Sequence, residues 1–160
     1  MRSGWLAALF LVAFSVSCGG PAVDLTKGVQ FVDVTSGWLD VGIVDGQNKL
    51  VPSLTFKLKN TSDQSLNVLQ ANVVFHRGTD ADEWGNAFLP IAGSEGLAPG
   101  ATSKSFTANS QQGYKSTEPR ADMLKSQYFI DARAEVSVKY AANAWQKCGD
   151  FPITRQIITR

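Results

Sequence analysis

The stretch from Lys49 to Arg77, KLVPSLTFKLKNTSDQSLNVLQANVVFHR, decides the predicted fold. Between residues 54 and 58, leucine and phenylalanine alternate with threonine and lysine, so one face of a β-strand is apolar and the other is polar. Turn-forming residues follow at 60–63, and the alternation resumes at 69–75. We predict two antiparallel strands joined by a polar turn, with one apolar face that packs on a second sheet.

The same period of two recurs along the rest of the chain. It is clearest in residues 129–140, where we expect Ile130 and the even positions up to Tyr140 to face the core. Residues 117–125 fit a short helix that Thr117 would cap. The other predicted strands are 29–34, 39–43, 84–91 at a sheet edge, 103–108 and a last one from 151 onward. About seven strands and one helical turn predict an all-β, immunoglobulin-like antiparallel sandwich.

The first predicted strand has no clean phase. Val29 and Phe31 share one face, whereas Val32 and Val34 share the other. Such a pattern indicates a strand that is covered on both sides or shifted by a β-bulge. We therefore expect either one long, kinked strand or two short ones, with Gly37 as the candidate bulge residue.

Residues 49–106 resemble the FxLYD-type sandwich domains of bacterial envelope proteins. The resemblance rests on the strand 54–58, the turn Asn60-Thr61-Ser62, the strand 66–75, and Leu97-Ala98-Pro99-Gly100 before Phe106. It covers somewhat over a third of the chain. It implies the sandwich architecture and nearly nothing about activity.

Residues 1–17 have the composition of an export signal. Arg2 precedes the ten apolar residues 5–14, and small residues follow at 15–17. Ten residues make about 15 Å of helix, half of a ~30 Å hydrocarbon core, so a membrane-spanning helix is not expected. We predict a cleaved signal peptide at 1–17, a tether at 18–27 and a sandwich domain at 28–160.

The four residues Ser15-Val16-Ser17-Cys18 resemble the lipobox of bacterial lipoproteins. The resemblance implies that Cys18 receives a diacylglycerol thioether and becomes the acylated N-terminus. Gly19 carries no inner-membrane retention signal in that family, which implies a periplasm-facing anchor in the outer membrane. An ordinary signal peptidase could cut at the same bond and would leave Cys18 as a free thiol.

The charge of the mature chain is balanced. The whole chain has 15 basic and 14 acidic residues, and removal of Arg2 with the signal peptide leaves 14 of each. Nucleic-acid-binding proteins usually carry a basic patch, and the sequence contains no basic run. We therefore expect no nucleic acid among the partners.

The candidate chemical groups are few. His76 is the only histidine, and no Gly-x-Ser-x-Gly or His-Glu-x-x-His motif accompanies it, so we predict a surface or hairpin-end position and no catalytic role. Asp80, Asp82 and Glu83 could offer oxygens to Ca²⁺, but the glycine and distant glutamate of an EF-hand loop are missing. We therefore predict that these three residues form an acidic loop without a bound metal.

The tryptophans and the second cysteine are the remaining candidates. We expect Trp38 in the core, whereas Trp84 and Trp145 lie beside turns and could pack at an edge or line a surface groove. If Cys18 is lipidated, Cys148 is a free thiol or pairs between chains. Asn60-Thr61-Ser62 matches a glycosylation sequon, which we interpret as chance.

These observations favour a non-catalytic binding or structural module of the bacterial cell envelope. We expect a membrane anchor at Cys18, another envelope protein as partner, and no cofactor. The alternative is a carrier of a small ligand or metal. An enzyme is the least expected class, because no convergent set of titratable groups is visible.

Overall fold

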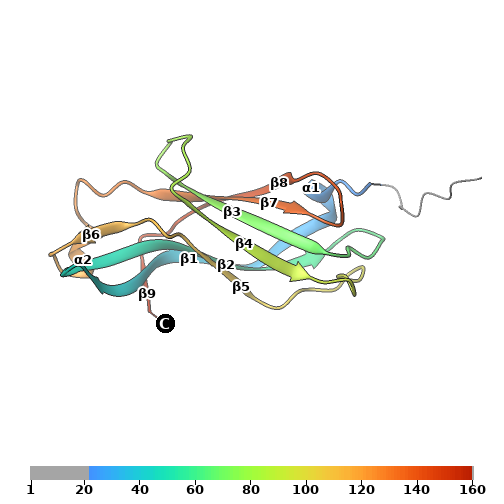
Figure 1. Ribbon diagram of the computed structural model, residues 1–160, viewed down its shortest axis with the longest axis horizontal. Helices are drawn as coiled ribbons and strands as arrows, with labels where there is room; N and C mark the ends of the chain where they lie inside the picture. Colours follow the sequence, from blue (N-terminus) through green and yellow to red (C-terminus); the bar gives the residue numbers. More distant parts are fainter. Residues whose placement is uncertain (1–21, 160) are drawn as a thin grey trace, which may run out of the picture.

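The computed structural model describes residues 22–159, which form two packed β-sheets (Figure 1). One sheet has the strand order β5-β2-β1-β9, with β6 also pairing with β2, and the other has the order β4-β3-β7-β8. The strands are β1 (Val29–Val44), β2 (Gln47–Asn60), β3 (Leu69–Arg77), β4 (Gly85–Ala92), β5 (Phe106–Asn109), β6 (Tyr114–Ser116), β7 (Ala132–Lys139), β8 (Gln146–Pro152) and β9 (Ile157–Ile158). The helices are α1 (Leu25–Gly28) and α2 (Arg120–Met123). The predicted antiparallel sandwich is confirmed, with two more strands than expected and one parallel pair, β1 with β9.

The Lys49–Arg77 stretch contributes one strand to each sheet, so the predicted hairpin is wrong. β2 pairs with β1, β5 and β6, whereas β3 pairs with β4 and β7. The alternation itself is correct: the apolar rows of both strands are fully buried. They face each other across the core because residues 61–68 are long enough to cross the ~10 Å between two sheets. Leu66, in the middle of this connection, is itself buried and bridges to Leu97.

β1 is a single kinked strand of 16 residues, which confirms the first of the two predicted alternatives. Its register against β2 shifts at 33–34 and at 41. Gly37 is not at either shift, so its predicted role as a bulge is wrong. A Cβ atom at Gly37 would lie 2.8 Å from the side chain of Ile158 and 2.9 Å from the carbonyl oxygen of Gln156. Glycine is therefore needed there because the chain around β9 approaches closely.

The strand predicted at 129–140 begins only at Ala132. Its inner row is buried from there to Tyr140, but Ile130 is exposed, so its predicted core position is wrong. The Gly78 amide still donates to the Asp131 carbonyl oxygen at 2.6 Å. Arg155 binds the chain just before this point, because its guanidinium donates to the Phe129 carbonyl oxygen and pairs with Asp131.

Three other predicted elements have different bounds in the structure. The edge strand predicted at 84–91 is β4, which lies at the edge of its sheet and contains Pro90. The strand predicted at 103–108 is reduced to β5. The helix predicted at 117–125 is one turn, and Pro119 rather than Thr117 takes the N-cap position.

The chain before β1 packs against the sandwich, which corrects the predicted tether at 18–27. Asp24 caps α1 by accepting a hydrogen bond from the Thr26 amide, and Leu25 is fully buried. The Val23 amide donates to the phenol oxygen of Tyr140 at 2.9 Å. Residues 22–27 therefore belong to the domain. The signal peptide predicted at 1–17 and the lipidation site Cys18 lie outside the described residues.

The core lies between the two sheets. Its largest fully buried side chains are Trp38, Phe56, Phe75, Leu25, Leu50, Leu54, Leu58, Leu66, Leu69, Val73, Val136 and Val138. Trp38 is thus in the core, as predicted. Within residues 22–159, no helix has the length and apolar character needed to cross a membrane.

Candidate functional site

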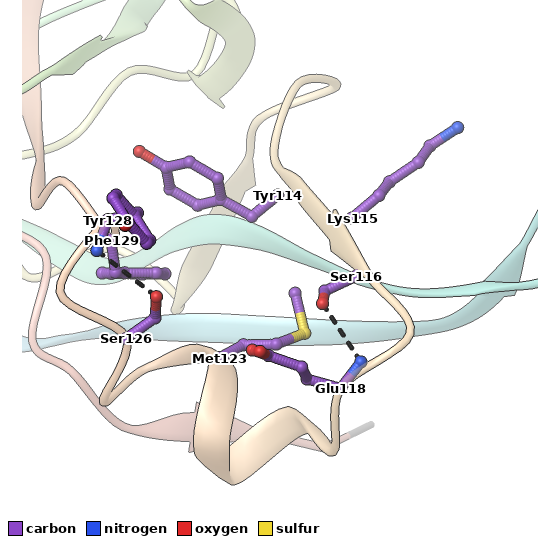
Figure 2. Close-up of a pocket in the computed structure, with 8 residues that line it drawn as sticks. All are labelled: Tyr114, Lys115, Ser116, Glu118, Met123, Ser126, Tyr128 and Phe129. Atoms are coloured by element: carbon purple, nitrogen blue, oxygen red, sulfur yellow. Dashed lines mark hydrogen bonds between the residues drawn. The ribbon is translucent and has the colours of Figure 1, made fainter.

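A hollow of about 250 Å³ opens at the end of the sandwich where β6 and α2 lie, opposite the end that carries α1 (Figure 1). It lies between β6 and the segment 118–129 (Figure 2). Its lining residues are Tyr114, Lys115, Ser116, Glu118, Met123, Ser126, Tyr128 and Phe129. All eight come from one stretch of sequence that folds back on itself.

One wall of the hollow is β6, which is held by pairing with the start of β2. Asn48 pairs with Ser116 and Leu50 with Tyr114. Gly113 makes this approach possible, because a Cβ atom there would lie 2.1 Å from the carbonyl oxygen of Leu50. A larger residue at 113 would push Tyr114 away from the sheet.

The opposite wall is fixed by polar contacts around α2. The Glu118 amide donates to the hydroxyl of Ser116 at 3.0 Å, and the amide of the Asn48 side chain donates to the Glu118 carbonyl oxygen at 2.8 Å. Arg120 forms an ion pair with Asp40 of β1. Partial burial opposes ionisation of Asp40, but hydrogen bonds from Arg120 and from the backbone lower its pKa below the usual value. Asp40 is therefore charged at neutral pH and holds α2 against the sheet.

Two lining residues, Tyr114 and Phe129, belong to an aromatic cluster that extends beyond the hollow to Trp38 and Trp84. The ring centroid of Trp38 lies 4.6 Å from that of Phe129 and 5.6 Å from that of Tyr114, and Trp84 lies 5.1 Å from Tyr114. The Tyr114 hydroxyl donates to the Ile130 carbonyl oxygen at 3.1 Å, and burial raises the pKa of this phenol. The cluster is rigid because every ring packs on at least one other ring.

The lining suits a ligand that is apolar along its length and positively charged at one end. Tyr128 is 81% exposed at the rim, and Met123 lies below it as a polarizable surface. Glu118 is the only carboxylate of the lining. The only cation, Lys115, points away from the hollow (Figure 2), and its Nζ lies 2.6 Å from Asp45. Tyrosine rings beside an uncompensated carboxylate attract lysine, arginine or other organic cations.

His76 is not at this site. Of its two predicted positions, the hairpin end is the one found, because His76 lies next to the end of β3 at the hairpin with β4, whereas the surface position is wrong. It lies on the outer face of β3, as the alternation indicated, but it is only 8% exposed because the loop 78–84 folds over it. Its Nδ1 lies 3.0 Å from the carbonyl oxygen of Asp82. This contact joins His76 to the loop that covers it, which is a structural role.

Asp80, Asp82 and Glu83 lie on that loop and are exposed. Asp80 pairs with Arg77 at 3.5 Å, and Glu83 accepts a hydrogen bond from Asn86. Within residues 22–159, no group of three or more histidine, cysteine, aspartate or glutamate side chains is placed to bind a metal.

The two tryptophans whose position was left open differ from each other. Trp84 is partly buried against Tyr114 and Trp38, whereas Trp145 is 42% exposed at the other end of the molecule. Cys148 is half-buried in β8, its Sγ lies 3.2 Å from the Gln146 carbonyl oxygen, and burial raises the pKa of its thiol. The predicted lipidation of Cys18 and its alternative, a bridge to Cys148, stay predictions.

The sequence analysis missed the residues of the hollow, because 110–116 is mostly polar and shows no alternation of apolar and polar residues. Two signals were present: Tyr114 is a single aromatic residue in a polar stretch, and Tyr128-Phe129 is an aromatic pair beside a turn. An aromatic residue in a polar segment often marks a packing or binding contact.

No family model matches this chain, and no curated protein sequence matches it. Solved structures are similar to it, among them the following two. One is described as "X-ray structure of Northeast Structural Genomics Consortium target SoR45", with 11% identity and a TM-score of 0.46 over 81% of this chain and 88% of that chain. The other is described as "Solution structure of AT1g01470 from Arabidopsis Thaliana", with 13% identity and a TM-score of 0.40 over 81% of each chain.

Proposed function

We propose that the chain is a lipid-anchored, non-catalytic binding module that faces the periplasm from the outer membrane. Its hollow would bind a lysine or arginine side chain of a partner envelope protein. The observation that carries this proposal is the place of the hollow: it lies at the end of the sandwich opposite α1, where the chain from the proposed anchor enters (Figure 1). A partner could reach it without contacting the membrane.

The size of the hollow favours a protein side chain over a free ligand. Small-molecule pockets usually have volumes of about 300–1,000 Å³, and this hollow, at about 250 Å³, falls below that range. A lysine or arginine side chain is long, narrow and positive at its end, which matches the aromatic rim and the Glu118 carboxylate. Such a side chain would belong to a larger interface around the rim.

The binding proposal is tested with two lining variants, Tyr128→Ala and Glu118→Gln. Both positions are exposed, so both variants should fold normally. Loss of a cation–π or charge contact of about 0.5–2 kcal/mol should weaken partner binding roughly 2- to 30-fold. The measurement is quantitative pull-down from detergent-solubilised envelopes, followed by cross-linking mass spectrometry to identify the partner residue at the hollow.

Ile43→Ala is the matched control, because Ile43 is 71% exposed but does not line the hollow. It should retain the partners that the lining variants lose. If both lining variants capture the same proteins with the same yield as wild type, or if the cross-linked residue is not basic, the hollow is not the binding site.

The anchor is tested by intact mass spectrometry of the membrane-extracted protein. We expect a mature chain that begins at Cys18 and carries diacylglycerol and a further acyl chain. More than one acyl chain makes a stable anchor, since each buried CH₂ contributes roughly 0.8 kcal/mol. The contrary result is a soluble periplasmic chain without lipid, two hydrogens lighter than the reduced mass, in which Cys18 is bridged to Cys148.

A further inference from the structure

An exposed aromatic patch lies on the outer face of the sheet β4-β3-β7-β8. Its residues are Phe88, Lys139 and Trp145, and Phe88 is 54% exposed. The two rings meet edge to face with centroids 6.4 Å apart, and the Nζ of Lys139 lies 5.1 Å from the centre of the Trp145 ring. Large aromatic side chains held together on a surface indicate a contact site.

The patch is next to the place where the N-terminal chain joins the domain. Gln146, which directly follows Trp145, accepts a hydrogen bond from the Leu25 amide at 2.9 Å and donates one to the Val23 carbonyl oxygen at 3.2 Å. Four residues lie between Cys18 and Val23, and the five Cα-to-Cα steps from one to the other span at most about 18 Å when fully extended. A lipid on Cys18 therefore keeps Trp145 close to the membrane.

The chemistry of the patch suits the headgroup region of a bilayer. Tryptophan and lysine each combine an apolar body with a polar end, and tryptophan is enriched where hydrocarbon meets water. A further apolar side chain, Val68, is 41% exposed at the same end of the sandwich. The loop before it is joined to the turn before Trp145 by a hydrogen bond from the Ala141 amide to the Asn67 carbonyl oxygen.

We infer that Trp145, with Phe88 and Lys139, docks into the headgroup region of the membrane in which Cys18 is anchored. The inference rests on the lipidation of Cys18 proposed above. It also specifies how the protein is oriented on the membrane, because docking at this end directs the hollow away from the lipid. The occupant of the patch is therefore a phospholipid surface.

The test uses the full-length lipidated protein in vesicles of phosphatidylethanolamine and phosphatidylglycerol, with and without brominated acyl chains. Once the signal peptide is removed, the chain contains Trp38, Trp84 and Trp145. Trp38 is fully buried and Trp84 partly buried, so brominated lipid should quench mainly Trp145. We expect partial quenching in wild type and its loss in Trp145→Phe. Trp145→Tyr serves as a second variant that keeps the contact with Lys139.

The control is Ile43→Ala at the opposite end, next to the start of β2 that pairs with β6, which should leave the quenching unchanged. Mass spectrometry of the same sample separates the two possible failures. A lipidated protein whose wild-type and Trp145→Phe forms are quenched equally overturns the docking and leaves the anchor intact. A chain that carries no lipid overturns both.

Discussion

Replacing Val136 with aspartate should unfold the protein or lower its free energy of unfolding by at least about 4 kcal/mol, a large part of a typical 5–15 kcal/mol. Val136 is fully buried in β7, between Val73 of β3 and Gly149 of β8. The new carboxylate would lie in the core with no cation beside it. It would have to ionise there without compensation or fold only in its protonated form, and both are costly.

Glu135→Ser, one residue away, is the matched control. Glu135 points to the outer face, where its carboxylate lies 2.7 Å from Lys147 and 3.8 Å from Arg133. Exposed ion pairs contribute little, so the free energy of unfolding should change by less than about 0.5 kcal/mol. Urea denaturation followed by circular dichroism measures both variants. The opposite ranking would mean that β7 has its faces inverted.

The alternation of side chains predicted most strands and their buried faces, because it depends only on local backbone geometry. It could not predict which strands are neighbours. An apolar row in β2 and another in β3 have the same appearance in the sequence whether they lie side by side or face each other. The connection 61–68 is long enough for the chain to cross from one sheet to the other, and its buried Leu66 stabilises that path.

The same limit explains the errors at single residues. Alternation placed His76 on the outer face of β3, but it contains no information on whether a loop covers that face. The hollow was missed because the partners of Tyr114 come from elsewhere in the sequence: Leu50 in β2, Trp38 in β1 and Phe129 before β7. A strand of three residues is too short to show a period.

Asn60 shows how a turn residue can have a wider role. The sequence analysis predicted a turn at 60–63. Short polar side chains in turns commonly bond to the nearby backbone, and the Ser62 amide does donate to the Asn60 side chain at 2.9 Å. The amide nitrogen of the same side chain also donates to the carbonyl oxygens of Gln64 at 2.9 Å and Leu97 at 2.7 Å. Asn60 is fully buried. It therefore joins the end of β2 to the loop before Gly100, and its match to a glycosylation sequon has no bearing on this role.

Asn60→Ala should lower the free energy of unfolding by about 3 kcal/mol, since it removes four hydrogen bonds of a buried side chain, each worth roughly 0.5–1.5 kcal/mol. The carbonyl oxygens of Gln64 and Leu97 would each lose one of two donors, because the Ser62 hydroxyl and the Leu66 amide also donate to them. Asn60→Asp, which has nearly the same shape, should be at least as harmful at neutral pH, because it places a carboxylate oxygen against those carbonyl oxygens.

The comparison is Asn67→Ala, at an exposed position in the same connection, where the side chain accepts one hydrogen bond from Ser65. We expect a loss below about 1 kcal/mol there. Thermal and urea unfolding of the three variants against wild type measure the difference. An Asn60→Ala protein as stable as Asn67→Ala would show that the hydrogen bonds of Asn60 contribute no more than those of a surface turn. The crossing from β2 to β3 would then be held by apolar contacts alone, chiefly by Leu66 in the core.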